Sequence, residues 1–143
     1  MGESSTDRNR AISLPAKVEN IAAVTAFLEQ KLETLGCPVK TQMQISVAAD
    51  EIVTNIASYA YAPGSGDLSV QFAFDEENRM AEITFTDSGI PFDPLQKEDP
   101  DVTLSAQERQ IGGLGIFLVK KTMDEVTYRR EDGKNILCIR KKI

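Results

Sequence analysis

The sequence ADEIVTNIA at residues 49–57 combines an apolar helical pattern with two polar side chains, Glu51 and Asn55, that lie four residues apart. On an α-helix, side chains at positions i and i+4 share one face and lie one turn apart. An apolar stripe that can be buried lies beside that face and consists of Ile45, Ala48, Ile52 and Ile56. The stretch therefore predicts a helix that packs on a core and carries a carboxylate and a carboxamide at its rim.

The Glu51 and Asn55 pair suits a site for a hard cation. Mg²⁺ prefers oxygen ligands and keeps several waters, so one amide oxygen together with substrate phosphates can hold it. The neighbouring carboxylate is then free to accept a proton. The alternative is a polar helix face in contact with solvent, because a pattern of two residues often arises by chance.

A second polar residue of interest, Asp87, ends a predicted strand. Ala81, Ile83 and Phe85 alternate with polar residues, as in a strand with one buried face, and Asp87 has the same parity. A buried carboxylate needs a hydrogen-bond donor, and the amino group of adenine is one candidate. Gly89 then permits backbone geometry that a larger residue would resist. The alternative is a turn aspartate that caps its own backbone.

Glycines crowd before an apolar helical pattern in the sequence IGGLGIFLV at residues 111–119. Glycines allow close approach of the backbone to a ligand, and the free N–H groups at a helix start favour an anion such as phosphate. No Gly-Lys-Ser/Thr follows, so this is not a Walker loop, and its late position does not fit a dinucleotide fingerprint. The alternative is a flexible loop that leads into a helix.

In order and spacing, these three elements resemble the N, G1 and G2 boxes of the Bergerat-fold ATPases, which include gyrase, histidine kinases and MutL. The closest likeness is to the small bacterial anti-sigma factor serine kinases, and it extends from about Ile12 to the C-terminus. The resemblance implies that Glu51 is the general base and Asn55 the Mg²⁺ ligand. It also implies that Asp87 binds the adenine of ATP.

The resemblance further assigns Gly89 to the G1 box and the segment Gly112, Gly113, Leu114 and Gly115 to the phosphate loop. Arg109, just before these glycines, would approach the γ-phosphate if the intervening segment folds over the nucleotide. One departure is that Pro91 stands where a G1 box usually has its second glycine. Proline stiffens this position, which is the start of the expected nucleotide lid.

Composition narrows the class of protein. The chain has 143 residues, 41% of them hydrophobic, which fits a single domain, expected at residues 11–143. Residues 1–10 are polar, and we expect them to form a disordered tail. The net charge of −6 argues against nucleic acid as a partner. The sequence contains no histidine, so it cannot pass phosphate through one as a sensor histidine kinase does.

No apolar run approaches transmembrane length, so we expect a cytoplasmic protein without a membrane partner. In that compartment we expect Cys37 and Cys138 to be reduced, and we expect both to be buried.

The remaining patterns predict a two-layer α/β (α+β) sandwich, with a mixed, largely antiparallel sheet and helices on one face. A helix from Val18 to Leu35 either covers the sheet or forms a homodimer surface. A loop at about residues 90–110 is expected to be the ATP lid. The other expected elements are an edge strand at residues 10–15, a helix at 38–59, paired strands at 68–74 and 81–87, and a hairpin with strands at 126–130 and 136–139.

The function implied by the resemblance is that of an ATP-Mg²⁺-dependent serine kinase of the anti-sigma factor type. Such a protein phosphorylates a STAS-domain antagonist, the anti-anti-sigma protein, and sequesters a sigma factor. The alternative from a different class is a non-catalytic module in which ATP gates the binding of a regulatory partner. Pro91 favours the module, whereas Glu51 favours the kinase, because a pure binder needs no base.

Overall fold

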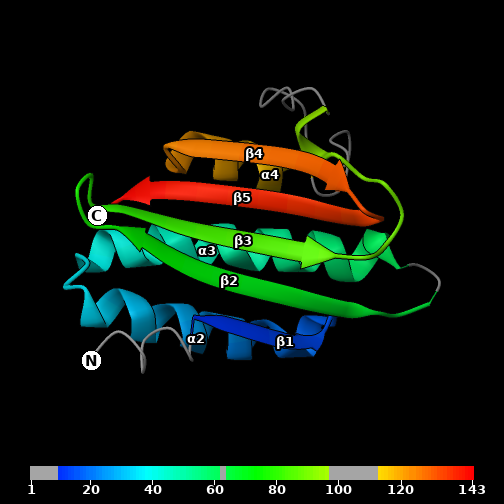
Figure 1. Cartoon of the computed structure of the whole chain (residues 1–143), viewed down its shortest axis with the longest axis horizontal. Helices are drawn as coiled ribbons and strands as arrows, with labels where there is room; N and C mark the ends of the chain where they lie inside the picture. The colour runs from blue at the N-terminus through cyan, green and yellow to red at the C-terminus, as the bar shows by residue number, and fades with distance from the viewer. Residues whose placement is uncertain (1–9, 62–63, 97–112) are drawn as a thin grey trace.

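The protein folds into two layers, an open five-stranded sheet and three helices that all lie on one of its faces (Figure 1). The computed structural model describes residues 10–61, 64–96 and 113–143. The strand order is β1-β2-β3-β5-β4, and each neighbouring pair is antiparallel. The predicted sandwich is therefore confirmed, with a sheet that is antiparallel at every described pairing instead of mixed.

The elements follow the sequence patterns closely. In chain order they are β1 (Ala11–Pro15), η1 (Val18–Asn20), α2 (Ile21–Thr34), α3 (Val39–Asn55), η2 (Ile56–Ala60), β2 (Asp67–Asp75), β3 (Met80–Asp87), η3 (Pro94–Gln96), α4 (Gly113–Thr122), β4 (Glu125–Glu131) and β5 (Lys134–Lys142).

The core lies between the helices and the inward faces of the central strands. Alternate residues of β2 and β3 point into it, so that Val70 pairs with Phe85 across the two strands and both are fully buried. Period-two alternation places every second side chain on the same face, which is why these strands could be read from the sequence. Asp87 continues the buried parity of β3 and is only 5% exposed, as predicted.

The second helix differs from the prediction at its end. The expected helix at residues 38–59 is α-helical from Val39 to Asn55 and then continues as one π-helical turn, η2. π-helical turns are rare and occur frequently at functional sites. The change of helix type falls immediately after Asn55, one of the predicted site residues.

The first helix covers the sheet. Val24, Leu28 and Leu32 of α2 are buried in the core. Val18, which was expected to begin the apolar stripe, lies in the short turn η1 and is 57% exposed. The inner residues of the stripe are thus used for packing within this chain.

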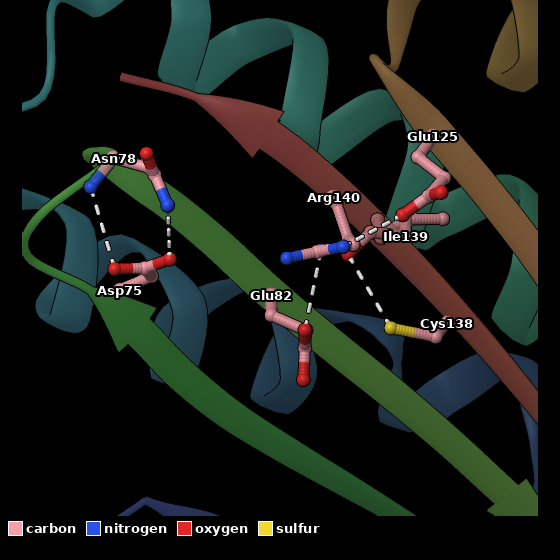
Figure 2. Close-up of polar contacts among 7 residues, drawn as sticks. All are labelled: Asp75, Asn78, Glu82, Glu125, Cys138, Ile139 and Arg140. Atoms are coloured by element: carbon pink, nitrogen blue, oxygen red, sulfur yellow. Dashed lines mark hydrogen bonds and ion pairs between the residues drawn. The ribbon is translucent and has the colours of Figure 1, made fainter.

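The face of the sheet opposite the helices carries polar side chains (Figure 2). Arg140 of β5 bridges the two adjacent strands through ion pairs with Glu82 and Glu125, and its hydrogen bond to Glu125 raises the pKa of Arg140. In the β2–β3 turn, the side chain and backbone N–H of Asn78 donate to Asp75 and lower the pKa of Asp75. These contacts link β3 to its neighbour β5 and stabilise the β2–β3 turn.

Neither cysteine forms a disulfide, as expected. Cys37 is buried, whereas Cys138 on the open face of the sheet is only half-buried, which differs from the prediction. In the described part of the chain, no helix has the length and apolar character needed to cross a membrane. Residues 1–9 of the predicted tail (residues 1–10), Arg109, Gly112 and most of the expected lid lie outside the described residues, whereas Arg10 is described and its carbonyl accepts a hydrogen bond from the backbone N–H of Phe72.

Candidate nucleotide-binding site

A pocket, partly open to solvent, lies between the helices and one end of the sheet. Its walls come from α3 with η2, the end of β3, the segment after β3, the start of α4, β4 and β5. Most of the lining is apolar. The lining residues are Ile52, Asn55, Ile56, Ala60, Asp87, Phe92, Pro94, Ile116, Tyr128, Asn135 and Leu137.

Three polar side chains face this apolar pocket. Asn55, Asp87 and Asn135 are the only buried polar residues in the described part of the chain, and all three line the pocket. Burying a polar group costs free energy unless it is hydrogen-bonded, so buried polar groups gathered in one apolar pocket mark a binding site. Two of the three, Asn55 and Asp87, were predicted from the sequence.

Asp87 uses one carboxylate oxygen for internal contacts. Its Oδ1 accepts hydrogen bonds from the backbone N–H of Gly89 and from Nδ2 of Asn135, both at 2.9 Å. The bond from Gly89 is the backbone cap that the sequence left open as the alternative role of Asp87. No hydrogen bond from another described residue reaches Oδ2, which leaves that oxygen available to a donor in the pocket.

Asn135 is the site residue that the sequence reasoning did not identify. It lies opposite Asp87 in the β3–β5 pairing, and its Nδ2 also donates to the carbonyl of Ile90. Its Oδ1 accepts from the hydroxyl of Tyr128 at 2.6 Å and from the backbone N–H of Phe92 at 3.3 Å. Asn135 therefore orients Asp87 and fixes the chain just beyond it. The same parity rule that identified Asp87 would have found it, since Asn135 shares the buried face with Leu137 and Ile139.

Gly89 packs directly on the π-helical turn. A Cβ at this position would overlap the carbonyl group of Ala60, so no larger side chain fits without a backbone shift. The backbone N–H of Ile90 donates to that same carbonyl at 2.8 Å, and Arg130 donates to the carbonyl of Gly89. The turn η2 thus supplies the surface on which the segment after β3 is anchored.

Glu51 contacts the first turn of α4. A Cβ added to Gly115 would overlap the Glu51 carboxylate, so any larger residue at this position would displace the end of the Glu51 side chain. Free N–H groups at the start of a helix carry partial positive charge and attract anions. Gly113, Leu114 and Gly115 form this first turn, so the described part of the predicted phosphate loop lies beside the Glu51 and Asn55 pair.

The described residues have the donor and acceptor types that ATP and Mg²⁺ require. The apolar pocket with Oδ2 of Asp87, to which no described residue donates, suits a purine ring with an exocyclic amino group. The start of α4 suits phosphates, and the carboxamide oxygen of Asn55 suits Mg²⁺ held jointly with them. An α/β sandwich that combines this pocket with a glycine-rich helix start defines the class of ATP-binding domains that the sequence resembled.

Comparison with known proteins gives the family. Residues 14–141 match the histidine kinase-like ATPase domain, and the chain belongs to this family. The resemblance stated from the three motifs is confirmed.

Named relatives in this family are protein kinases. The chain is 29% identical over 100 residues to the serine/threonine-protein kinase BtrW of Bordetella bronchiseptica, an alignment that covers 70% of each protein. It is 27% identical over 130 residues to the serine-protein kinase RsbW of Bacillus thuringiensis, which covers 88% of this chain and 80% of that relative. The kinase class expected from the sequence agrees with these names.

Solved structures share the fold. The crystal structure of the RsbU and RsbW domains of Rv1364c from Mycobacterium tuberculosis superposes with a TM-score of 0.64 at 16% identity, over 92% of this chain and 32% of that one. The SiaB-SiaC complex from Pseudomonas aeruginosa gives a TM-score of 0.57 at 16% identity, over 99% of this chain and 95% of the matched chain. At this identity, both likenesses concern the fold.

Proposed function

We propose that this protein is an ATP-Mg²⁺-dependent protein serine kinase that phosphorylates a STAS-domain antagonist and sequesters a sigma factor. The observation that carries the proposal is that Asn55, Asp87 and Asn135, the buried polar residues of the described chain, share one apolar pocket beside the start of α4. The names of the relatives, serine/threonine-protein kinase and serine-protein kinase, support the same enzyme class.

Adenine occupies the apolar pocket in this proposal. The Oδ2 atom of Asp87 accepts a hydrogen bond from the exocyclic amino group, while Asn135 holds the carboxylate in place through Oδ1. Gly89 allows the backbone after Asp87 to lie close to η2, which keeps the pocket wall in position. Guanine presents a carbonyl oxygen where adenine has its amino group, so this contact selects adenine nucleotides.

The phosphates lie at the start of α4. Backbone N–H groups of Gly113, Leu114 and Gly115 stabilise negative charge on the β- and γ-phosphates. Asn55 supplies an oxygen ligand to Mg²⁺, which neutralises charge on the phosphates when bound. Gly112 and Arg109 precede this turn in the sequence and lie outside the described residues, so their part in phosphate binding stays a prediction from the sequence.

Glu51 acts as the general base. It accepts the proton of the attacking serine hydroxyl, or orients that hydroxyl, as the carboxylate of a kinase does. Its contact with Gly115 holds the carboxylate next to the phosphate site. The hydroxyl oxygen attacks the γ-phosphorus, the bond to the β-phosphate oxygen breaks, and ADP leaves.

A second candidate is an ATP-gated binding module without phosphoryl transfer. It is favoured by Pro91, which restricts the backbone just where the Asn135 contacts also fix it. The two functions are separated by incubating the purified chain with γ-labelled ATP, Mg²⁺ and the STAS-domain proteins of its own organism. The kinase proposal expects label on a serine of one of them. ATP-dependent binding without labelling would establish the module instead.

A further inference from the structure

An apolar groove runs between α3 and α4, which lie antiparallel on the same face of the sheet (Figure 1). Three apolar side chains along it are exposed to solvent: Met43 at 63%, Val47 at 51% and Leu118 at 41%. Its floor is formed by Ala48 and Val119, which are buried. Exposed apolar side chains gathered in one groove mark an interaction surface more often than isolated ones do.

The groove contains Glu51. Asn55 lines the nucleotide pocket, whereas Glu51, one turn earlier on α3, lines the groove. The proposed base is thus presented toward the groove, and the proposed metal ligand toward the nucleotide. A serine on another protein cannot reach Glu51 without bringing its neighbouring residues against this surface.

We infer that the groove between α3 and α4 is the docking surface for the protein substrate, an inference that rests on the proposed kinase function. Met43 and Glu51 are eight residues apart, which is about 12 Å along a helix. The partner therefore carries apolar side chains within about 12 Å of the acceptor serine. These side chains pack on Met43, Val47 and Leu118 while the hydroxyl meets Glu51.

Two positively charged side chains at the end of the groove far from Glu51 indicate that the partner is acidic there. Lys40 lies one turn before Gln44 on α3, and Lys121 lies three residues after Leu118 on α4, and both lysines are exposed. The chain as a whole carries a net charge of −6, which repels an acidic partner, so the two lysines are a local exception. Acidic residues on the partner would be attracted here, which sets its orientation with the serine at the Glu51 end.

The N-terminal segment of this chain is a poorer occupant. Residues 1–9 read MGESSTDRN and contain one apolar residue of any size, Met1. Such a segment cannot fill three exposed apolar positions. A second copy of this chain is the other apolar candidate, and it is distinguished by the oligomeric state.

The test compares Val47→Glu with Val18→Glu. Both valines are exposed to a similar degree, 51% and 57%, but Val18 lies in η1 at the start of the first helical segment, outside the groove. The readouts are the KM for a STAS-domain protein that the unmutated chain phosphorylates, the KM for ATP, and sedimentation. We expect Val47→Glu to raise the KM for the STAS-domain protein about tenfold or more, with the KM for ATP unchanged. Val18→Glu should change neither the KM for the STAS-domain protein nor the KM for ATP.

Two charge-reversal variants give a second measurement. Lys40→Glu should raise the KM for the STAS-domain protein. Lys17→Glu should leave it unchanged, because Lys17 is an exposed lysine away from the groove. An unchanged KM in Val47→Glu, with phosphorylation intact, would overturn the docking surface and leave the kinase proposal standing. A changed sedimentation coefficient in Val47→Glu would assign the groove to a second copy. If the unmutated chain neither binds nor phosphorylates any STAS-domain protein, both proposals are overturned.

Discussion

Glu51 and Asn55 lie one turn apart on α3 yet line different cavities, Glu51 the groove against α4 and Asn55 the apolar pocket at the end of the sheet. This division matches the two roles that a kinase needs from such a pair. A metal ligand belongs with the phosphates of the nucleotide, and a base belongs on the side from which the acceptor hydroxyl arrives.

The contact between Gly115 and Glu51 can be tested by stability. Gly115→Ala places a methyl group where the Glu51 carboxylate lies, so the flexible Glu51 side chain must turn aside, and this displacement offsets the higher helix propensity of alanine. Without the carboxylate the offset disappears, so we expect Gly115→Ala to stabilise the Glu51→Ala background more than the unmutated chain, by about 0.5–1 kcal/mol in the free energy of unfolding. Urea unfolding of the four proteins measures the coupling. Strictly additive effects would contradict the contact.

In the proposed site, adenine selection rests on Asp87. Asp87→Asn removes the negative charge of the carboxylate and replaces one acceptor oxygen with an NH₂ group, so the free energy of ATP binding should weaken by roughly 1–3 kcal/mol. Calorimetric titration of the unmutated protein should also give a clear preference for ATP over GTP. Equal affinities for the two nucleotides would rule out the assignment of Asp87 to adenine.

Asn135 should matter for stability and for nucleotide affinity together. Asn135→Ala removes the donor to Asp87 and to the carbonyl of Ile90, and leaves these buried groups short of a partner, at a cost of about 1–3 kcal/mol in unfolding. Tyr128→Phe is the matched control, because it removes only the hydroxyl that donates to Asn135. We expect a larger loss of ATP affinity in Asn135→Ala than in Tyr128→Phe. The reverse order would show that Asn135 does not position Asp87.

Burial raises the pKa of both the Cys37 and Cys138 thiols. The folded state therefore keeps these thiols neutral at pH values where the unfolded chain, with a thiol pKa of about 8.5, begins to ionise. Their contribution to stability is present below that pH and declines as pH rises through the folded pKa. Thermal unfolding at pH 7 and pH 9.5 should show a smaller decline for Cys37→Ala/Cys138→Ala than for the unmutated chain. An identical decline would exclude the thiols as its cause.

The sequence predicted most of the fold because its strands and helices have strong periodicity. The alternation in β2 and β3 gave their inward faces, and the same parity predicted that Asp87 is buried. The π-helical turn after Asn55 was not predicted, because no local sequence pattern marks it, and the contacts of Gly89 and Ile90 with the carbonyl of Ala60 link it to residues distant in the sequence. Val18 was expected in the apolar stripe, yet the chain enters α2 through η1 and leaves it exposed.

The site residues that were predicted are those that belong to a motif. Glu51, Asn55 and Asp87 have spacings that relate to chemistry, whereas Asn135 acts through a pairing with Asp87 that only the strand order of the sheet establishes. The separation of Glu51 and Asn55 into two cavities also depends on how α4 packs against α3. No local pattern in the sequence encodes that packing.

The central claim, that Glu51 is the base of a protein kinase, is tested most directly by Glu51→Gln. This substitution keeps the shape of the side chain and removes the proton acceptor, so ATP-Mg²⁺ affinity should stay nearly unchanged while phosphorylation of the STAS-domain protein falls by roughly 10²–10⁴-fold. Asn55→Ala should instead lower Mg²⁺-dependent ATP binding and phosphorylation together, with Mg²⁺-free binding as its control. Phosphorylation by Glu51→Gln at the unmutated rate would contradict the account.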